Sequence, residues 1–170
     1  MNRGVRFGFD GDDSSKWPDA FKGVSVGPTN FSYNMRGVEA GLVNYTEGGS
    51  KAGQFGLYNN ATGSDSVQCG LWNNSECTKP FSYGEAKPFS YDKPNSLQIG
   101  VMNTAADRQR SFQIGAFNGA YEKSDAIQIG LVCFAGKEGN HLQLGLLTIR
   151  NSGPWYSRIT PLIGWHRQRE

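Results

Sequence analysis

Large apolar residues alternate with small or polar residues along most of the chain, and the alternation returns at a nearly constant interval. The clearest run is Leu97-Gln-Ile-Gly-Val-Met-Asn103, and similar heptads follow at 112–118, 127–133 and 142–148. Alternation with a period of two is typical of a strand, and no helix-period pattern of useful length appears. The chain is therefore predicted to be all-β.

The repeat also covers the first half of the chain, in weaker form. Earlier copies lie at 24–30, 38–44, 53–59 and 67–73, and successive repeat glycines are fourteen or fifteen residues apart except for one gap of thirty, between Gly70 and Gly100. This gap predicts one degenerate copy. We expect a single repeat domain over 1–170, with an N-terminal cap at 1–23, repeats at 24–148, an irregular insertion at 76–95, and a C-terminal cap and tail at 149–170. Residues 160–166 resemble a divergent terminal copy, as is usual at the ends of repeat proteins.

Each heptad has one residue type at each place when it is numbered from its glycine as position 0. Positions −3, −1 and +1 are mostly apolar, position −2 is Gln in six copies, position +3 is usually Asn, and position +5 is Ala in four copies. Odd positions share one face of a strand. We expect that face to be the core, with Ile99, Ile114, Ile129 and Leu144 buried, and Ile129→Ala to cost ~2–5 kcal/mol. The Gln residues and the large residues at position +2 are expected on the opposite face.

Two layouts fit an all-β repeat of this length. In a parallel β-solenoid each period is one coil, and identical residues stack on one another about 4.8 Å apart. In an antiparallel β-meander or barrel each period is one strand and its turn. Stacking in register explains why Gln, Gly, Asn and Ala keep their places, because it forms amide ladders and identical corners. The solenoid is therefore the preferred prediction.

The phrase Gln-Ile-Gly-Leu-x-Asn resembles the bacterial surface-repeat proteins that are built from tandem copies of x-Gln-Ile-Gly-Leu-x-Asn. The similarity covers about 24–148, although Cys133 and Thr148 stand where Asn is usual. The resemblance implies a bacterial, often cell-surface or exported, protein of unknown biochemical role, and it transfers no catalytic residues. The first eight residues lack the long apolar core of a secretory signal.

Charge and composition exclude some classes of partner. The net charge of +2 gives no electrostatic footprint for nucleic acid, and no apolar run approaches the ~18 residues of a membrane-spanning helix. The three cysteines do not form a closed disulfide framework; Cys69 and Cys133 are interpreted as small buried residues and Cys77 as a loop thiol.

Motifs that suggest chemistry are weak. Gly23-Val-Ser-Val-Gly27 fits a nucleophile elbow, but no helix pattern follows it, and His141 and His166 are far apart. The Asp10, Asp12 and Ser14 spacing of a calcium loop fails at its glycine and closing glutamate. No catalytic residue, cofactor or metal ligand is predicted.

The candidate binding residues are aromatic or large and apolar. One group occupies position +2 of successive repeats, and the other lies in the twin Lys-Pro-Phe-Ser-Tyr segments at 79–83 and 87–91. The +2 row either packs under a loop or second sheet, or forms an exposed binding or self-association stripe. The predicted residues are Tyr58, Trp72, Met102 and Phe117 in the row, and Phe81, Tyr83, Phe89 and Tyr91 in the twin segments.

The leading functional hypothesis is a non-catalytic repeat scaffold that binds a protein or glycan partner or associates with itself as a homo-oligomer. The alternative is an enzyme with a site in the irregular middle or terminal segments. A buried cluster of Asp, Glu, His or Cys in those segments would favour the enzyme.

Overall fold

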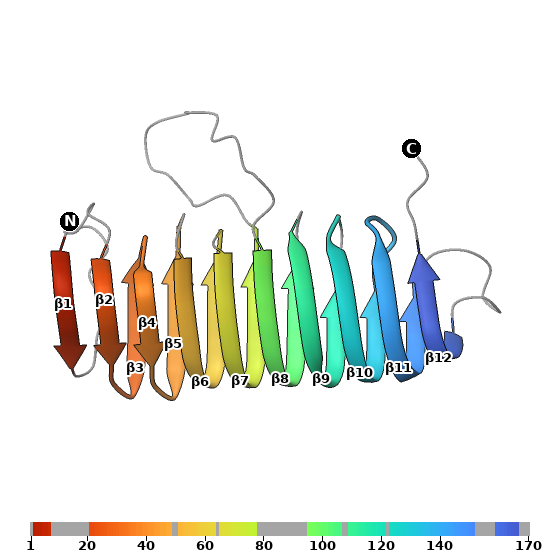
Figure 1. Cartoon of the computed structure of the whole chain (residues 1–170), viewed down its shortest axis with the longest axis horizontal. Helices are drawn as coiled ribbons and strands as arrows, with labels where there is room; N and C mark the ends of the chain where they lie inside the picture. The colour runs from red at the N-terminus through yellow and green to blue at the C-terminus, as the bar shows by residue number, and fades with distance from the viewer. Residues whose placement is uncertain are drawn as a thin grey trace, which may run out of the picture.

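The protein is a stack of strands with no helix in the described residues (Figure 1). The structure is a computed structural model that describes residues 2–7, 21–48, 51–63, 65–77, 95–106, 109–121, 123–151 and 159–166. The strands are β1 (Asn2–Phe7), β2 (Phe21–Val26), β3 (Thr29–Tyr33), β4 (Arg36–Ala40), β5 (Val43–Glu47), β6 (Lys51–Thr62), β7 (Asp65–Glu76), β8 (Asn95–Ala106), β9 (Arg110–Ala120), β10 (Asp125–Ala135), β11 (His141–Arg150) and β12 (Ile159–His166).

Successive repeats pair in parallel and in register, so the chain forms a β-solenoid. Leu97 pairs with Phe112 and Asn103 with Asn118, in the same strand direction. This pairing confirms the solenoid and excludes the antiparallel layout. The position −2 glutamines also stack in register as predicted: Gln54, Gln68, Gln98, Gln113, Gln128 and Gln143.

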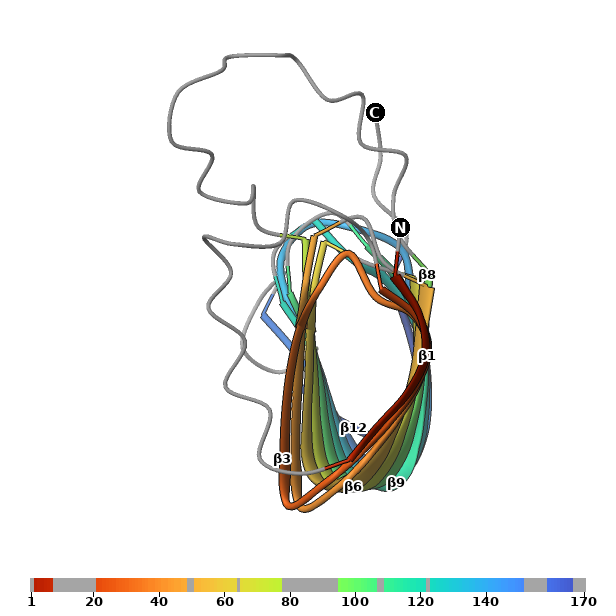
Figure 2. The ribbon, with the colours of Figure 1, turned by 90° about the vertical axis from the view of Figure 1, so that its left-hand side faces the viewer.

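Each coil contributes to two parallel sheets that face each other across a narrow interior, which appears as a flattened ring when viewed along the stack (Figure 2). The first sheet contains β1, β2, β4 and the first halves of the long strands β6 to β11. The second contains β3, β5 and the second halves of the same long strands, because β4 pairs with the beginning of β6 and β5 with its end. The repeat glycine marks the corner between the two halves.

The corner interrupts the alternation of the strand. The backbone amides of Leu57 and Tyr58 both donate to the carbonyl of Leu42, at 3.0 and 2.9 Å. Two consecutive residues, positions +1 and +2, therefore face outward before Asn59 at position +3 turns inward. Position +2 consequently lies outside, and the prediction that it shares a face with the glutamines is wrong.

The interior is built from polar and small side chains, and the predicted core is wrong. Ile99 is 43% exposed, and Ile114, Ile129 and Leu144 are each 38% exposed. The buried positions are −4, −2, +3 and +5, which carry mainly Ser, Gln, Asn and Ala respectively. The physical reason is the short coil: its two sheets lie so close that a Gln side chain from one strand reaches the backbone of the opposite strand.

The glutamines form a continuous buried ladder. Each Nε2 from Gln68 to Gln143 donates to the Oε1 of the glutamine one coil earlier, at 2.7 to 2.9 Å. From Gln54 to Gln128, each Nε2 also donates across the coil to the backbone carbonyl at position +4, at 2.8 to 3.1 Å. The ladder begins at the buried Glu39, whose Oε2 accepts from Gln54 at 3.0 Å. A buried amide is costly unless it is paired, and this arrangement pairs both hydrogens of the Gln amide.

The asparagines form a second ladder on the other side of the interior. From Asn30 to Asn103, each Nδ2 donates to the Oδ1 of the asparagine one coil later, at 2.7 to 2.9 Å. The same Nδ2 donates to the carbonyl at position −1 of that later coil, as from Asn73 to Ile99 at 3.0 Å. These contacts bring the corners so close that a Cβ on Gly100 would lie 2.1 Å from the Gly70 oxygen. Glycine is therefore required at position 0.

The irregular segments differ from the expected copies. Gly70 pairs directly with Gly100, so no degenerate coil separates β7 from β8, and the residues between Cys77 and Asn95 are an insertion. β12 runs antiparallel to β11 and places Gly164 opposite Gln143, so residues 160–166 are a reversed end strand and not a copy in register. β1 pairs in parallel with β2 at the other end.

Candidate binding surface

The predicted aromatic row is a continuous feature of the outer surface. Tyr58 pairs with Trp72, Trp72 with Met102, and Met102 with Phe117, so the four side chains stand on adjacent coils. Trp72 is 46% and Phe117 51% exposed, and the Tyr58 and Trp72 rings meet edge to face with centroids 5.9 Å apart. We name these four residues the aromatic row. The second predicted group, Phe81, Tyr83, Phe89 and Tyr91, lies outside the described residues.

A larger apolar surface covers the outside of the first sheet and continues onto the corner at position +1, where the sequence predicted the core. Its residues occupy positions −3, −1 and +1 of seven coils, and we name them the aliphatic face. No charged side chain interrupts it. The face consists of Val38, Ala40, Leu42, Gly53, Phe55, Leu57, Val67, Cys69, Leu71, Leu97, Ile99, Val101, Phe112, Ile114, Ala116, Ile127, Ile129, Leu131, Leu142, Leu144 and Leu146. The apolar alternation found these residues but assigned them to the wrong side of the strand.

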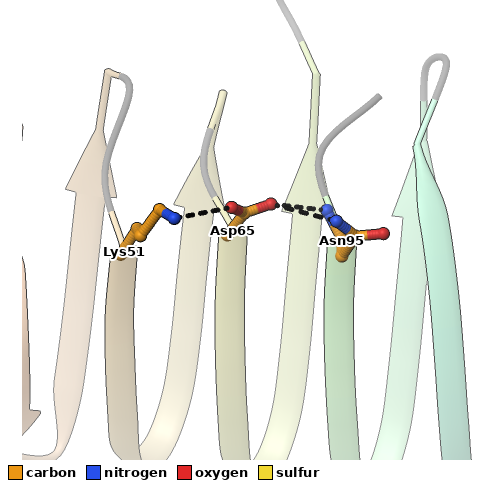
Figure 3. A network of polar contacts seen from close by, with 3 residues as sticks. All are labelled: Lys51, Asp65 and Asn95. Atoms are coloured by element: carbon orange, nitrogen blue, oxygen red, sulfur yellow. Dashed lines mark hydrogen bonds and ion pairs between the residues drawn. The ribbon is translucent and has the colours of Figure 1, made fainter. Parts of the chain in front are cut away.

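One edge of the aliphatic face is a row of charged and amide side chains at position −5. Lys51 Nζ lies 3.9 Å from Asp65 Oδ2, and Asp65 Oδ1 accepts from the backbone amide of Asn95 at 2.8 Å (Figure 3). Asp125 repeats this contact, with its Oδ1 2.9 Å from the backbone nitrogen of Asn140. The row thus holds both signs of charge close to the aliphatic face.

A groove of about 550 Å³ lies beside this edge, over β8 to β11, and Trp165 of β12 contributes to its wall. Ser111 and His141 line it, but the buried Ser111 hydroxyl makes no hydrogen bond, and His141 Nε2 lies 3.1 Å from the Glu138 carbonyl. The groove therefore contains no nucleophile paired with a base. Elsewhere in the described part of the chain, no three His, Cys, Asp or Glu side chains are placed to hold a metal ion.

None of the three cysteines forms a disulfide, and their surroundings differ. Cys69 is exposed at position −1, contrary to the expectation that it is buried, because that position faces outward. Cys133 is buried at position +3, as expected, and replaces an asparagine of the second ladder. Burial raises the pKa of the Cys133 thiol, and a hydrogen bond from Asn118 partly opposes this. Because the nucleophile is the thiolate, burial and the raised pKa lead us to expect Cys133 to be a packing residue of low reactivity.

Among the described residues no helix has the length and apolar character needed to cross a membrane. Comparison with protein-family models, with curated proteins and with solved structures found no match.

Proposed function

We propose that this protein is a non-catalytic repeat scaffold that binds a protein or glycan partner through its outer apolar surface. One observation supports this most. Along the stack the Gln and Asn side chains point inward and form the two ladders, whereas the large apolar side chains point outward. Exposed apolar surface of this extent usually marks an interaction site. The cell-surface or exported location implied by the resemblance remains part of the proposal.

The aromatic row is the proposed contact with the partner. Trp and Tyr bury a large area at low conformational cost, and both are enriched among residues that dominate binding energy. The row stands on the second sheet, where neighbouring coils offer the side chains of Asn60 and Asn74 at position +4, both half-buried. Aromatic rings flanked by amides suit an extended peptide or a glycan, which both need stacking together with hydrogen bonds.

The test uses defined ligand libraries. The full chain is screened against a random-peptide phage library and a glycan array, and any selected ligand is titrated against Trp72→Ser/Phe117→Ser. We expect the double variant to lose at least tenfold in affinity. Leu131→Ser is the matched control, because Leu131 and Phe117 are both 51% exposed but Leu131 belongs to the aliphatic face. An absence of ligands, or ligands that bind the double variant equally well while its circular dichroism is unchanged, would refute the aromatic row as the site.

A further inference from the structure

The aliphatic face is large enough for a stable protein interface. It continues from β4 and β6 to β11 onto β2 and β1 at one end, through Val24, Val26, Val5 and Phe7, and onto Ile163 and Trp165 of β12 at the other. The face therefore extends across ten neighbouring strands. At ~4.8 Å between strands and ~3.3 Å per residue, each residue covers about 16 Å², and the 44 residues from position −3 to +1 of the seven coils and from −3 to −1 of β1, β2 and β12 give a footprint of roughly 700 Å². A standard interface buries about 800 Å² on each partner, whereas the largest apolar patch of a typical monomer is about 300–600 Å².

The surface also restricts what fits against it. Its apolar ridges repeat at the strand spacing, and a partner that packs between them needs a flat sheet with the same spacing and no charge. A second copy of the chain meets both conditions. We propose that two copies pack through their aliphatic faces as a symmetric dimer. This deepens the proposed function, because it names one partner, but it uses a different surface from the aromatic row.

Symmetry and the charge pairs at the edge of the face together select one arrangement. The two-fold axis lies in the plane between the two facing sheets, parallel to the strands and directly over β8. It places β7 of one copy opposite β9 of the other, β6 opposite β10, β4 opposite β11 and β2 opposite β12. Because β8 is the fifth of the nine strands from β2 to β12, this register overlaps nine of the ten strands and leaves β1 of each copy outside the overlap. It keeps the strands of the two sheets aligned, as in ordinary sheet packing about 10 Å apart. Each copy presents the same patch, as a two-fold interface requires.

The charged edge favours the same register. Lys51 of one copy lies opposite Asp125 of the other, and Asp65 lies opposite Arg110, so these four charges meet their opposites. Arg36 of the same row lies opposite the uncharged Asn140. A shift by one strand in one direction also overlaps β1, but it brings Lys51 opposite Arg110 and leaves only Arg36 opposite Asp125 as an unlike pair. The shift in the other direction brings Asp65 opposite Asp125. Both alternatives have fewer opposite-charge pairs than the proposed register and add a like pair.

Side-chain size is complementary in this register as well. Gly53 faces Ile127, and Ala40 faces Leu144, so the smallest residues of the face lie against large ones. Val67 likewise faces Phe112 beside the groove. Alternation of small and large side chains across two facing sheets lets their ridges interdigitate.

The first experiment measures mass. Sedimentation equilibrium of the full chain is expected to give twice the chain mass of 18.6 kDa at micromolar concentration. Ile99 lies on the axis and faces its own copy, so Ile99→Lys is expected to weaken the dimer at least 100-fold. Leu147→Lys, at a similarly exposed position on the second sheet, should leave it unchanged. A monomeric wild type, a dimer that survives Ile99→Lys, or one that is lost in Leu147→Lys would overturn the proposal.

Two further outcomes separate this proposal from its alternatives. The first outcome is a monomeric wild type that floats with phosphatidylcholine vesicles, together with an Ile99→Lys variant that does not float. In that case the aliphatic face binds lipid and the dimer is refuted. If the dimer is absent but ligands of the aromatic row are found, the proposed function stands without this inference. The circular dichroism spectrum of Ile99→Lys serves as the folding control and is expected to match the wild type, since Ile99 is exposed in the single chain.

The second experiment tests the register by cross-linking. In a Cys69→Ser/Cys77→Ser background, Ile99→Cys places two thiols across the axis, about one sheet separation of ~10 Å apart. A short bismaleimide is then expected to give a covalent dimer. Ile129→Cys is the matched control: it lies in the same row, but its two copies are four strands apart, about 19 Å, along the stack. Equal or greater cross-linking of Ile129→Cys would refute the register.

The third experiment tests the charge pairs. Arg110→Glu places two carboxylates opposite each other at two symmetric positions and is expected to raise the dimer dissociation constant about tenfold. Adding Asp65→Arg restores opposite charges and should recover most of that loss. If the double variant is as weak as Arg110→Glu alone or weaker, these two residues do not face each other.

Discussion

The side-chain amide of Gln113 donates a hydrogen bond to the side-chain oxygen of Gln98, one coil earlier, at 2.7 Å. In the same two coils Asn103 donates to Asn118, one coil later, at 2.9 Å. The two buried ladders therefore run in opposite directions along the stack, and their dipoles oppose each other. The interior is held by directional bonds, which transmit the register from one coil to the next.

The ladders predict that stability depends on polar residues more than on the large apolar ones. Gln128→Ala removes donors to Gln113 and to the Phe134 carbonyl and the acceptor for Gln143. Since each lost buried bond costs ~1 kcal/mol or more, we expect a loss of ~3–5 kcal/mol in unfolding free energy. Ile129→Ala, its outward neighbour, should cost less than ~1 kcal/mol.

Urea titration measures both variants in the Ile99→Lys background, so that burial of Ile129 in a dimer does not contribute. A larger loss for Ile129→Ala than for Gln128→Ala would contradict the polar interior.

The corner glycines predict a second contrast. A Cβ at Gly115 would lie 2.2 Å from the Gly100 oxygen and 2.5 Å from Asn103 Nδ2, so Gly115→Ala has to separate two coils. We expect it to abolish folding or to cost more than ~3 kcal/mol. At Gly53 the nearest atom to a Cβ is 3.6 Å away, and Gly53→Ala should be neutral or stabilise by ~0.4–1 kcal/mol through the unfolded chain. Thermal unfolding of both variants tests this, and equal effects would argue against close corners.

Cys133 predicts a stabilising substitution. Its thiol interrupts the asparagine ladder, with Sγ 3.8 Å from Asn118 Nδ2 and 3.9 Å from the Leu144 oxygen. In Cys133→Asn, the new side chain would accept from Asn118 Nδ2 through its oxygen and donate to the Leu144 carbonyl through its nitrogen. Asn118 and Asn103 of the earlier coils already make this pair of bonds. We expect a gain of ~1 kcal/mol, seen as a higher urea midpoint. Cys69→Asn, on the outside, offers no ladder contact and should give no such gain.

The thiols should also differ in reactivity. Burial raises the pKa of Cys133, so at pH 8 less of it is thiolate than in the unfolded chain, while Cys69 is exposed. With Ellman's reagent we expect Cys69 to react at once and Cys133 only as the protein unfolds. Because the folded state holds the Cys133 proton more tightly, stability should fall as the pH rises through the range in which the unfolded thiol ionises. Fast labelling of Cys133 in the native protein would contradict its burial.

The regular spacing of Gly100, Gly115, Gly130 and Gly145, together with the repeated Gln and Asn positions, favoured the solenoid over the antiparallel layout and predicted its register. When coils stack in register, each residue lies next to the residue at the same position of the neighbouring coil. The sequence must therefore repeat Gln and Asn where their side-chain amides bond to one another, and Gly where the corners touch. The aromatic row was found for the same reason, since one position of every coil becomes one line on the surface.

Which face is inside was decided only by the tertiary structure. The alternation around Ile129 separates two faces but does not say which one is buried, and the usual preference of apolar residues for the core led to the wrong assignment. In a coil of fifteen residues the distance between the two facing sheets is about the length of one Gln side chain. Gln128 can therefore donate both to Gln113 of the preceding coil and to the Phe134 carbonyl across the interior. The outward direction of position +2 depends on the same closure, because the glycine corner turns two consecutive residues away from the interior.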